Sequence, residues 1–139
     1  MAADYATDFY GWATETARKI RSGKLEEVNL EQVAEEIESL GKSEQQQLSN
    51  RLIILLTHML KWEFQPSKRK IGWQGTIIEQ RERAKRLLAK NPSLQPLVDE
   101  TIAEAYSIAV ATAAFETHMV EEDFPRTCPY SRSEVLPDH

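Results

Sequence analysis

Apolar residues recur every three or four positions along most of this chain, and this spacing predicts amphipathic α-helices. A first helix is expected over 8–21, where Phe9, Trp12 and Ile20 fall on one face. Asp8 is a good N-cap for this helix, and Gly23 follows it as a stop signal.

The second predicted helix is the longest and covers 29–64, with Asn29 as its N-cap. Its apolar stripe consists of Leu30, Val33, Ala34, Ile37 and Leu40, followed by Leu48, Leu52, Leu55, Leu56, Met59 and Trp62. Gly41 interrupts the stripe, so we expect a break or a kink near this residue. The pattern leaves open whether Gly41 ends the helix or only bends it.

Two further helices and a tail complete the pattern. The helix expected over 69–89 has a thin apolar face and is placed at the edge of a bundle. Asn91 followed by Pro92 is a strong start signal for a helix over 92–117. The apolar stripe expected there consists of Leu94, Leu97, Val98, Thr101, Ala105, Ile108, Thr112 and Phe115. Prolines beyond Thr117 predict an irregular C-terminal tail.

These elements define the expected fold class. No stretch alternates apolar and polar residues at period two, so strands are not expected. A chain of 139 residues has the usual size of one domain and is long enough to bury a core. The sequence therefore predicts an all-α fold, a compact bundle of about four amphipathic helices in a single domain over 1–139.

Composition narrows the class of protein further. The net charge of −5 gives no general attraction to nucleic acid or anionic lipid. The longest apolar run, Leu52 to Leu56, is far shorter than a membrane span, and the N-terminal residues do not resemble a secretion signal. Cys128 is the only cysteine, which excludes an internal disulfide and a CxxC motif. We therefore expect a cytoplasmic protein with no membrane partner and no cofactor.

The chain contains six segments in a characteristic order: DFYGWATETARKIRSG, AEEIESLG, HMLKWEFQP, GWQGTIIEQR, PSLQPLVDE and FPRTCPY. Together they resemble the family called domain of unknown function twenty-nine, a helical and mainly cyanobacterial family. The resemblance covers nearly the whole chain, implies a short, free-standing helical protein, and carries no catalytic residue across. Gly72 stands where a serine is common and His118 where a glycine is common. The second departure weakens any functional role for His118.

Glu35 and Glu38 share one face of the second predicted helix. Carboxylates build metal sites in helical bundles, where di-iron proteins use Glu-x-x-His pairs on two helices. No histidine follows a glutamate at that distance here, so a di-metal carboxylate site is not expected. The alternative is ionic contact, because a hairpin of the first two helices would bring Arg18 and Arg21 alongside the acidic segment 31–38.

His58 lies at the margin of the long apolar stripe, one turn from Ile54 and one turn from Trp62. Its charge changes near neutral pH, so it is a candidate general base or metal ligand, with Glu35 and Glu38 as candidate partners. A packed, hydrogen-bonded histidine at the edge of the core is the alternative.

A basic and aromatic turn is the best local signal for a partner. It is formed by Lys61, Lys68, Arg69, Lys70 and the flanking Trp62, Phe64 and Trp73. Such side chains bind phosphates and stack on bases. Acidic residues in the same region, among them Glu79 and Glu82, can pair with arginines at i,i+4. Such pairs are typical of a solvent-exposed helix face, and they are a sufficient reason for the basic residues. Nucleic-acid or anion binding is therefore possible but not favoured.

Three hypotheses follow. The leading one is a non-enzymatic helical interaction or structural module, acting as a homodimer or with an unidentified protein partner, because no set of chemical residues converges. The second is nucleic-acid or anion binding through the turn from Lys61 to Trp73. The third is a metal-dependent enzyme that uses His58 with Glu35 or Glu38.

Overall fold

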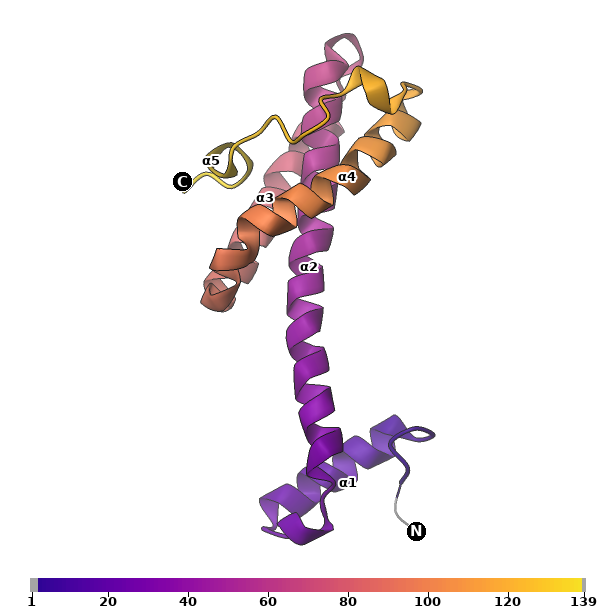
Figure 1. The fold of residues 1–139 in the computed structure, drawn as a ribbon, viewed down its shortest axis with the longest axis vertical. Helices are drawn as coiled ribbons and strands as arrows, with labels where there is room; N and C mark the ends of the chain where they lie inside the picture. The colour runs from indigo at the N-terminus through magenta and orange to yellow at the C-terminus, as the bar shows by residue number, and fades with distance from the viewer. Residues whose placement is uncertain (1–2, 139) are drawn as a thin grey trace. The chain divides into compact units, whose positions relative to one another are not determined.

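The computed structural model describes residues 3–138, and the regular structure within them is entirely helical. Its α-helices are α1 (Phe9–Arg21), α2 (Leu30–Phe64), α3 (Ile71–Lys90), α4 (Val98–Thr117) and α5 (Arg132–Val135) (Figure 1). Short 3-10 turns occur at Leu25–Glu27, Pro66–Lys68, Pro92–Leu97 and Glu121–Asp123. The predicted all-α fold class is confirmed.

The chain divides into two compact units, Met1–Lys42 and Ser43–His139. Helix α2 contributes its N-terminal part to the first unit and its C-terminal part to the second. It is one α-helix through Gly41, so the predicted break in secondary structure does not occur. The expectation of a single domain over 1–139 stays a prediction.

The helix ends of the first unit follow the predicted capping chemistry. The Asp8 carboxylate accepts a hydrogen bond from the Gly11 amide at 3.0 Å, and Asn29 Oδ1 accepts one from the Gln32 amide at 3.1 Å. Gly23, two residues after α1, has a φ of 76°, a backbone conformation that glycine adopts without strain. These three signals act locally, which explains why the sequence was sufficient to find them.

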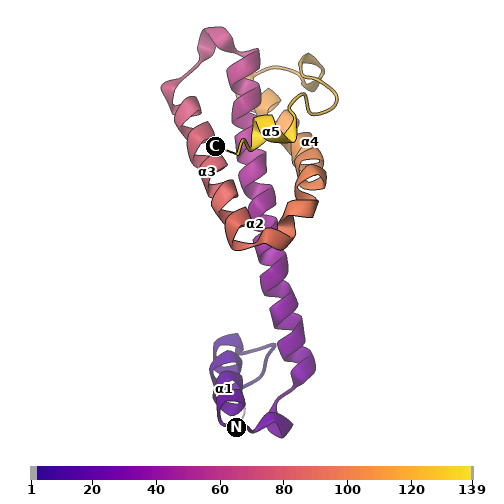
Figure 2. The ribbon, with the colours of Figure 1, turned by 90° about the vertical axis from the view of Figure 1, so that its left-hand side faces the viewer.

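Contacts between α1 and the first turns of α2 hold the first unit together (Figure 2). Trp12 Nε1 donates a hydrogen bond to Gln32 Oε1 at 3.0 Å, and the Tyr5 hydroxyl donates one to Glu36 Oε1 at 3.2 Å. The rings of Tyr5 and Trp12 lie 4.5 Å apart between centroids. None of the described residues of this unit is buried.

In the second unit, α3 and α4 flank the C-terminal half of α2 (Figure 2). The core consists of Leu48, Leu52, Leu55, Leu56 and Leu60 of α2, Ala84 and Leu88 of α3, Val98, Ile102, Ala105, Tyr106, Ala109, Val110, Ala113 and Ala114 of α4, and Leu94, Phe124, Val135 and Leu136. All the buried hydrophobic residues of the described chain therefore lie in this unit.

The start of α4 differs from the prediction. Residues 92–97 form a 3-10 helix, and the α-helix begins only at Val98 because Pro96 has no amide hydrogen to donate. The Asn91 side chain does not cap this segment. It donates instead to the Leu87 carbonyl, at the end of α3, and to Glu44 of α2, both at 3.0 Å.

The predicted apolar stripe of α4 is also partly wrong. Ile108 is 53% exposed and Phe115 is 83% exposed, although both were placed in the stripe. Alanines such as Ala109 and Ala113 are buried in their place. Because α4 is apolar around most of its circumference, its periodicity alone does not decide which face packs on α2.

The tail beyond α4 is irregular as predicted, except for the short 3-10 turn and α5. Ser131 and Glu134 form a reciprocal capping box at the start of α5, and Val135 behind them is fully buried. Within residues 3–138, no helix combines the length and the apolar content needed to cross a membrane.

Candidate functional site

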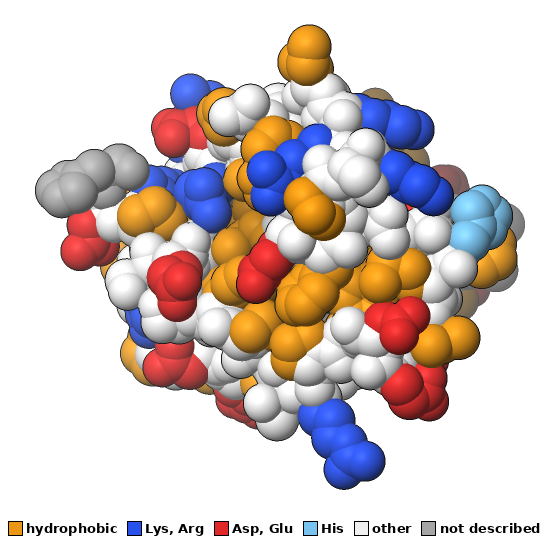
Figure 3. All heavy atoms as spheres, turned by 90° about the horizontal axis from the view of Figure 1, so that it is seen from above, with side chains coloured by type: hydrophobic (Ala, Val, Ile, Leu, Met, Phe, Trp, Pro, Cys, Tyr) orange, Lys and Arg blue, Asp and Glu red, His pale blue; other side chains and the backbone are white. Residues whose placement is uncertain are grey.

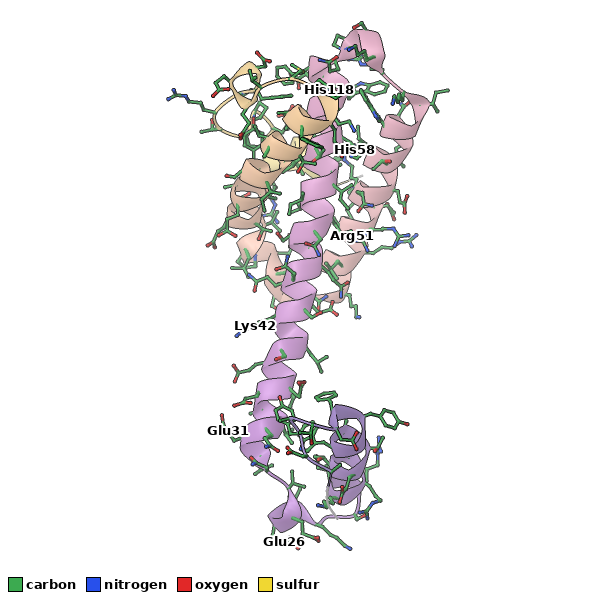
Figure 4. The ribbon with its side chains drawn as sticks, turned by 90° about the vertical axis from the view of Figure 1, so that its right-hand side faces the viewer. Glu26, Glu31, Lys42, Arg51, His58 and His118 are labelled. Carbon is green, nitrogen blue, oxygen red and sulfur yellow. The ribbon has the colours of Figure 1, made fainter. Side chains whose placement is uncertain are left out.

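His58 lies on α2 in the second unit and is half-buried (Figure 4). Its Nδ1 is 2.8 Å from the carbonyl oxygen of Ile54, one turn earlier on the same helix. Since a carbonyl only accepts, Nδ1 carries the proton and donates it to this bond. The arrangement is that of a packed histidine at the edge of a core.

The carboxylates proposed to act with His58 belong to the other unit. Glu35 and Glu38 are exposed on the N-terminal part of α2. In the described part of the chain, no group of three or more His, Cys, Asp or Glu side chains is placed to hold a metal ion. Catalysis by His58 with Glu35 or Glu38 stays a prediction without a geometric argument in its favour.

Lys61 is the most buried cation of the predicted anion-binding turn. Its side chain is only 10% exposed, and its Nζ donates to Glu116 of α4 at 2.9 Å. The same Nζ lies 4.9 Å from the centroid of the Trp73 ring, in a cation–π contact with α3. Lys61 thus connects three helices of the second unit, and its charge is matched within the protein.

Arg69 forms a separate pair with Trp62. The guanidinium lies 4.4 Å from the Trp62 ring centroid, and Arg69 Nε donates to the Trp62 carbonyl at 2.8 Å. Lys68 and Lys70 are exposed. The turn therefore holds two internal cation–aromatic pairs rather than one set of free cations, and anion or nucleic-acid binding by these residues stays a prediction.

The expected ionic contact between α1 and α2 does not form. Within residues 3–42, the ion pair is Lys19 with Glu15 at 3.6 Å, which lies inside α1. Arg18 and Arg21 do not pair with the acidic segment 31–38, because α1 meets α2 through Tyr5 and Trp12 instead. Arg18 and Arg21 of α1 stay exposed, as do Glu31, Glu35 and Glu38 of α2.

The sequence analysis missed a group of residues that fastens the tail to the bundle. The Tyr130 hydroxyl donates to the Glu63 carboxylate at 2.7 Å. Arg81 of α3 donates through Nε to the Val135 carbonyl at 2.9 Å and through Nη2 to the Glu134 carbonyl at 3.0 Å. Glu63 and Tyr130 lie in two of the characteristic segments, HMLKWEFQP and FPRTCPY, and this was the available signal.

Burial explains the electrostatics of this group. It raises the pKa of the Tyr130 phenol, and the hydrogen bond and negative charge of Glu63 raise it further. Burial also raises the pKa of the Cys128 thiol and lowers that of the Arg81 guanidinium. At neutral pH Cys128 is thus a protonated thiol, and a thiol is a poor nucleophile.

A surface pocket of about 430 Å³ lies between α2, α3 and the tail. It is lined by Met59, Trp62, Glu63, Arg69, Gln74, Ile77, Ile78, Arg81 and Tyr130. The charged groups in it are engaged with the protein itself: Glu63 with Tyr130, Arg69 with Trp62, and Arg81 with the tail carbonyls. The charged residues that line this pocket therefore have a structural role, and two of them hold the tail in place.

Exposed hydrophobic side chains concentrate in the first unit. Of the twelve large exposed hydrophobic residues in the described chain, seven lie before residue 43: Phe9, Tyr10, Ile20, Leu25, Leu30, Ile37 and Leu40. We call five of these side chains, Phe9, Ile20, Leu30, Ile37 and Leu40, the hairpin surface. Their exposed fractions run from 42% for Ile20 to 67% for Leu40.

The second unit carries fewer such residues in relation to its size: Ile71, Ile78, Ile108, Phe115 and Val120. Figure 3 shows the molecule from above, with hydrophobic side chains gathered at the centre of this face among charged ones. The second unit has a buried core besides its exposed residues, whereas residues 3–42 of the first unit are all exposed or half-buried.

Fold and contacts together define a small all-α protein in which a helical hairpin joins a cored helical bundle through one long helix. The chain belongs to the family described as "Domain of unknown function DUF29", whose model matches residues 5–139. No curated protein and no solved structure matches the chain.

Proposed function

We propose that this protein is a non-enzymatic interaction module that binds another protein chain through the hairpin surface. The observation that carries the proposal is the distribution of burial. Among the described residues, every buried hydrophobic side chain lies between Leu48 and Leu136, and the first unit contains none.

A unit of about 40 residues without a core is below the size at which chains normally fold alone. Such a unit gains stability when a partner covers its apolar side chains, at roughly 25 cal/mol per Å² of apolar surface removed from water. Exposed apolar areas of this kind mark protein interaction sites. Binding of a partner to the hairpin surface would therefore stabilise the protein more than binding elsewhere on it.

The polar groups of the second unit also support a non-enzymatic function, because they form hydrogen bonds within that unit. His58 bonds its own helix, Lys61 bonds Glu116, and Arg81 bonds the tail. Groups that are engaged in this way are poorly placed for catalysis. We place the interaction in the cytoplasm, where a lone cysteine such as Cys128 stays reduced.

The test is affinity capture with the full-length protein from cells that produce it. The disrupting variant is Leu30→Lys/Ile37→Lys, which places two charges on the hairpin surface. The matched control is Ile71→Lys, at a residue of the second unit that is 92% exposed. Circular dichroism establishes that all three proteins are equally helical.

We expect the wild type and the control to recover the same protein chains, further copies of this one included. The Leu30→Lys/Ile37→Lys variant should lose them. Recovery of the same chains by this variant, or of no chain by the wild type, would contradict the proposal.

A further inference from the structure

The pocket between α2, α3 and the tail contains an arginine without a counter-charge. Arg81 Nε donates to the Val135 carbonyl, and Nη2 donates to the Glu134 carbonyl and, at 3.8 Å, to Met59 Sδ. These acceptors are all neutral. Within residues 3–138, no ion pair involves Arg81. Its structural role therefore leaves the charge unmatched and leaves Nη1 able to donate to a further acceptor.

Burial makes this missing counter-charge costly. The Arg81 side chain is half-buried, and burial lowers the pKa of its guanidinium. A charge that is taken out of water is normally paired with an opposite one. Two exposed arginines of the same helix have such partners: Arg83 pairs with Glu79 at 2.9 Å and Arg86 with Glu82 at 3.5 Å. On α3 the more buried arginine of the three is thus the one without a carboxylate.

A second arginine of the pocket is in the same situation. Arg69 Nε donates to the Trp62 carbonyl, and its guanidinium lies on the Trp62 ring, which leaves the Nη1 and Nη2 edge open to an acceptor. No ion pair of the described chain involves Arg69. Among the described residues that line the pocket, Glu63 alone carries a carboxylate, and it accepts from Tyr130. The lining therefore has an excess of positive charge.

The remaining walls of the pocket are largely apolar. They consist of Met59, Trp62, Ile77, Ile78 and the Tyr130 ring, with Gln74 beside them. A small inorganic anion gains nothing from such walls, whereas an organic anion removes apolar surface from water there. Ligand pockets in proteins combine apolar walls with a few polar groups and have volumes of roughly 300–1,000 Å³. With about 430 Å³, this pocket has the size and the lining of a site for a small organic anion.

We propose that this pocket binds a small organic carboxylate with an apolar body. Its carboxylate accepts hydrogen bonds from Arg69 and Arg81, and its body lies against Trp62, Ile77 and Ile78. A carboxylate matches the planar guanidinium in charge and in geometry, and it supplies the counter-charge that the chain itself does not provide. All lining residues belong to the second unit, so the site is independent of the hairpin surface and goes beyond the proposed function.

The experiment is a titration of the full-length, isotope-labelled protein followed by ¹H–¹⁵N NMR, which gives both the dissociation constant and the place of binding. The probe is 3-phenylpropanoate. Two comparison probes each lack one half of it: 3-phenylpropanamide has no charge, and inorganic phosphate has no apolar body. We expect 3-phenylpropanoate to bind at least about tenfold more tightly than either, because a hydrogen bond to a charged group is worth about that factor. The resonances that shift should include the Trp62 indole and the Arg69 and Arg81 Nε–H groups.

Variants of the pocket test the two halves of the proposal. Arg69→Gln and Arg81→Gln should each weaken binding at least about tenfold. Because Arg81 also holds the tail, Ile78→Glu is a second variant that places a repelling carboxylate on a pocket residue that is 62% exposed, and it should weaken binding as well. The matched control is Arg83→Gln, on an exposed residue of the same helix outside the lining, which should bind as the wild type does. Circular dichroism establishes equal helicity of all variants.

A wild type that does not bind 3-phenylpropanoate overturns the proposal. The same holds if the amide or phosphate binds as tightly, or if the shifted resonances lie outside the pocket. Wild-type affinity in both Arg69→Gln and Ile78→Glu, or an equal loss in Arg83→Gln, would also contradict it. None of these results bears on the hairpin surface, whose test uses other residues.

Discussion

The Tyr130 hydroxyl donates a hydrogen bond to the Glu63 carboxylate at 2.7 Å and joins the tail to α2 across 67 positions of sequence. We expect Tyr130→Phe to lower the free energy of unfolding by about 1 kcal/mol, because it removes one hydrogen bond and keeps the ring. Urea unfolding measures this change, and limited proteolysis detects release of the tail. Tyr10→Phe is the control, since Tyr10 is 80% exposed on α1. Equal stability of the two variants would show that the Tyr130 bond contributes nothing.

Stability should fall at alkaline pH through Tyr106. Its side chain is buried and its hydroxyl donates to the Pro125 carbonyl. Burial, aided by the nearby Cys128 and Glu63, raises its pKa from 10.0 to about 12. The folded protein therefore favours the neutral phenol, so its contribution to stability is complete below pH 10.0 and is lost as the pH rises towards 12.

The check is urea unfolding over a pH series for the wild type and Tyr106→Phe. The phenylalanine has no proton to lose, so the difference in unfolding free energy between the two proteins should shrink as the pH rises through this window. A difference that stays constant with pH would contradict the assignment. Tyr130 titrates in both proteins, so the comparison isolates Tyr106.

Replacing His118 with glycine should stabilise the protein. His118 ends α4 with a φ of 58°, a left-handed conformation that costs a non-glycine residue roughly 1 kcal/mol. A residue in this conformation at the end of a helix is usually glycine. We expect His118→Gly to raise the unfolding free energy by about 0.5–1 kcal/mol, measured by thermal or urea unfolding.

The contrast for this substitution is Ser107→Gly, inside α4 on an exposed position. Glycine in a helix interior is destabilising, so this change should lower stability by a few tenths of a kcal/mol, roughly the difference between the two helix propensities. The same sign for both substitutions would show that the left-handed geometry of His118 is not the cause.

Two glycines should respond to alanine in opposite ways. At Gly11 an added Cβ would lie 2.4 Å from Asp8 Oδ2 and 2.9 Å from Ala3 Cβ, so it would disturb the cap of α1. At Gly41 an added Cβ would meet nothing within 4 Å. We expect Gly11→Ala to reduce helicity and stability by about 1 kcal/mol, the usual value of an N-cap, and Gly41→Ala to raise stability by roughly 0.5–1 kcal/mol.

Circular dichroism with thermal unfolding measures both glycine substitutions. If Gly11→Ala proved as stable as the wild type, the Asp8 cap would have to shift without cost. If Gly41→Ala were destabilising, residue 41 would need the backbone flexibility of glycine, which a regular helix does not require.

The sequence by itself determined what local physics controls. Asp8 and Asn29 cap helices because a short polar side chain reaches the free amides of the next turn. Four residues of the predicted stripe, Leu48, Leu52, Leu55 and Leu56, are buried because their spacing places them on one face of α2. The helical class and the positions of the long helices follow from such patterns.

Tertiary structure decided what depends on residues far apart in sequence. Lys61 reads as a free cation of a basic turn, yet Glu116, 55 positions away, neutralises it. The sequence indicates that Asn91 is an N-cap, but its side-chain amide donates hydrogen bonds to Glu44 and to the Leu87 carbonyl at the end of α3. The sequence predicts that Ile108 and Phe115 are core residues, but both are exposed. Alanines allow α4 to pack more closely on its neighbours, so the face of α4 that carries them is buried instead.

The same division holds for the candidate site. Spacing alone placed apolar residues on one face of each helix of the first unit, but it could not show that the structure leaves several of them uncovered. It also suggested a pairing of Arg18 and Arg21 with the acidic segment 31–38, which the contacts of Tyr5 and Trp12 replace. Local periodicity fixes which residues share a face, whereas only the packing of one element on another determines which faces stay open.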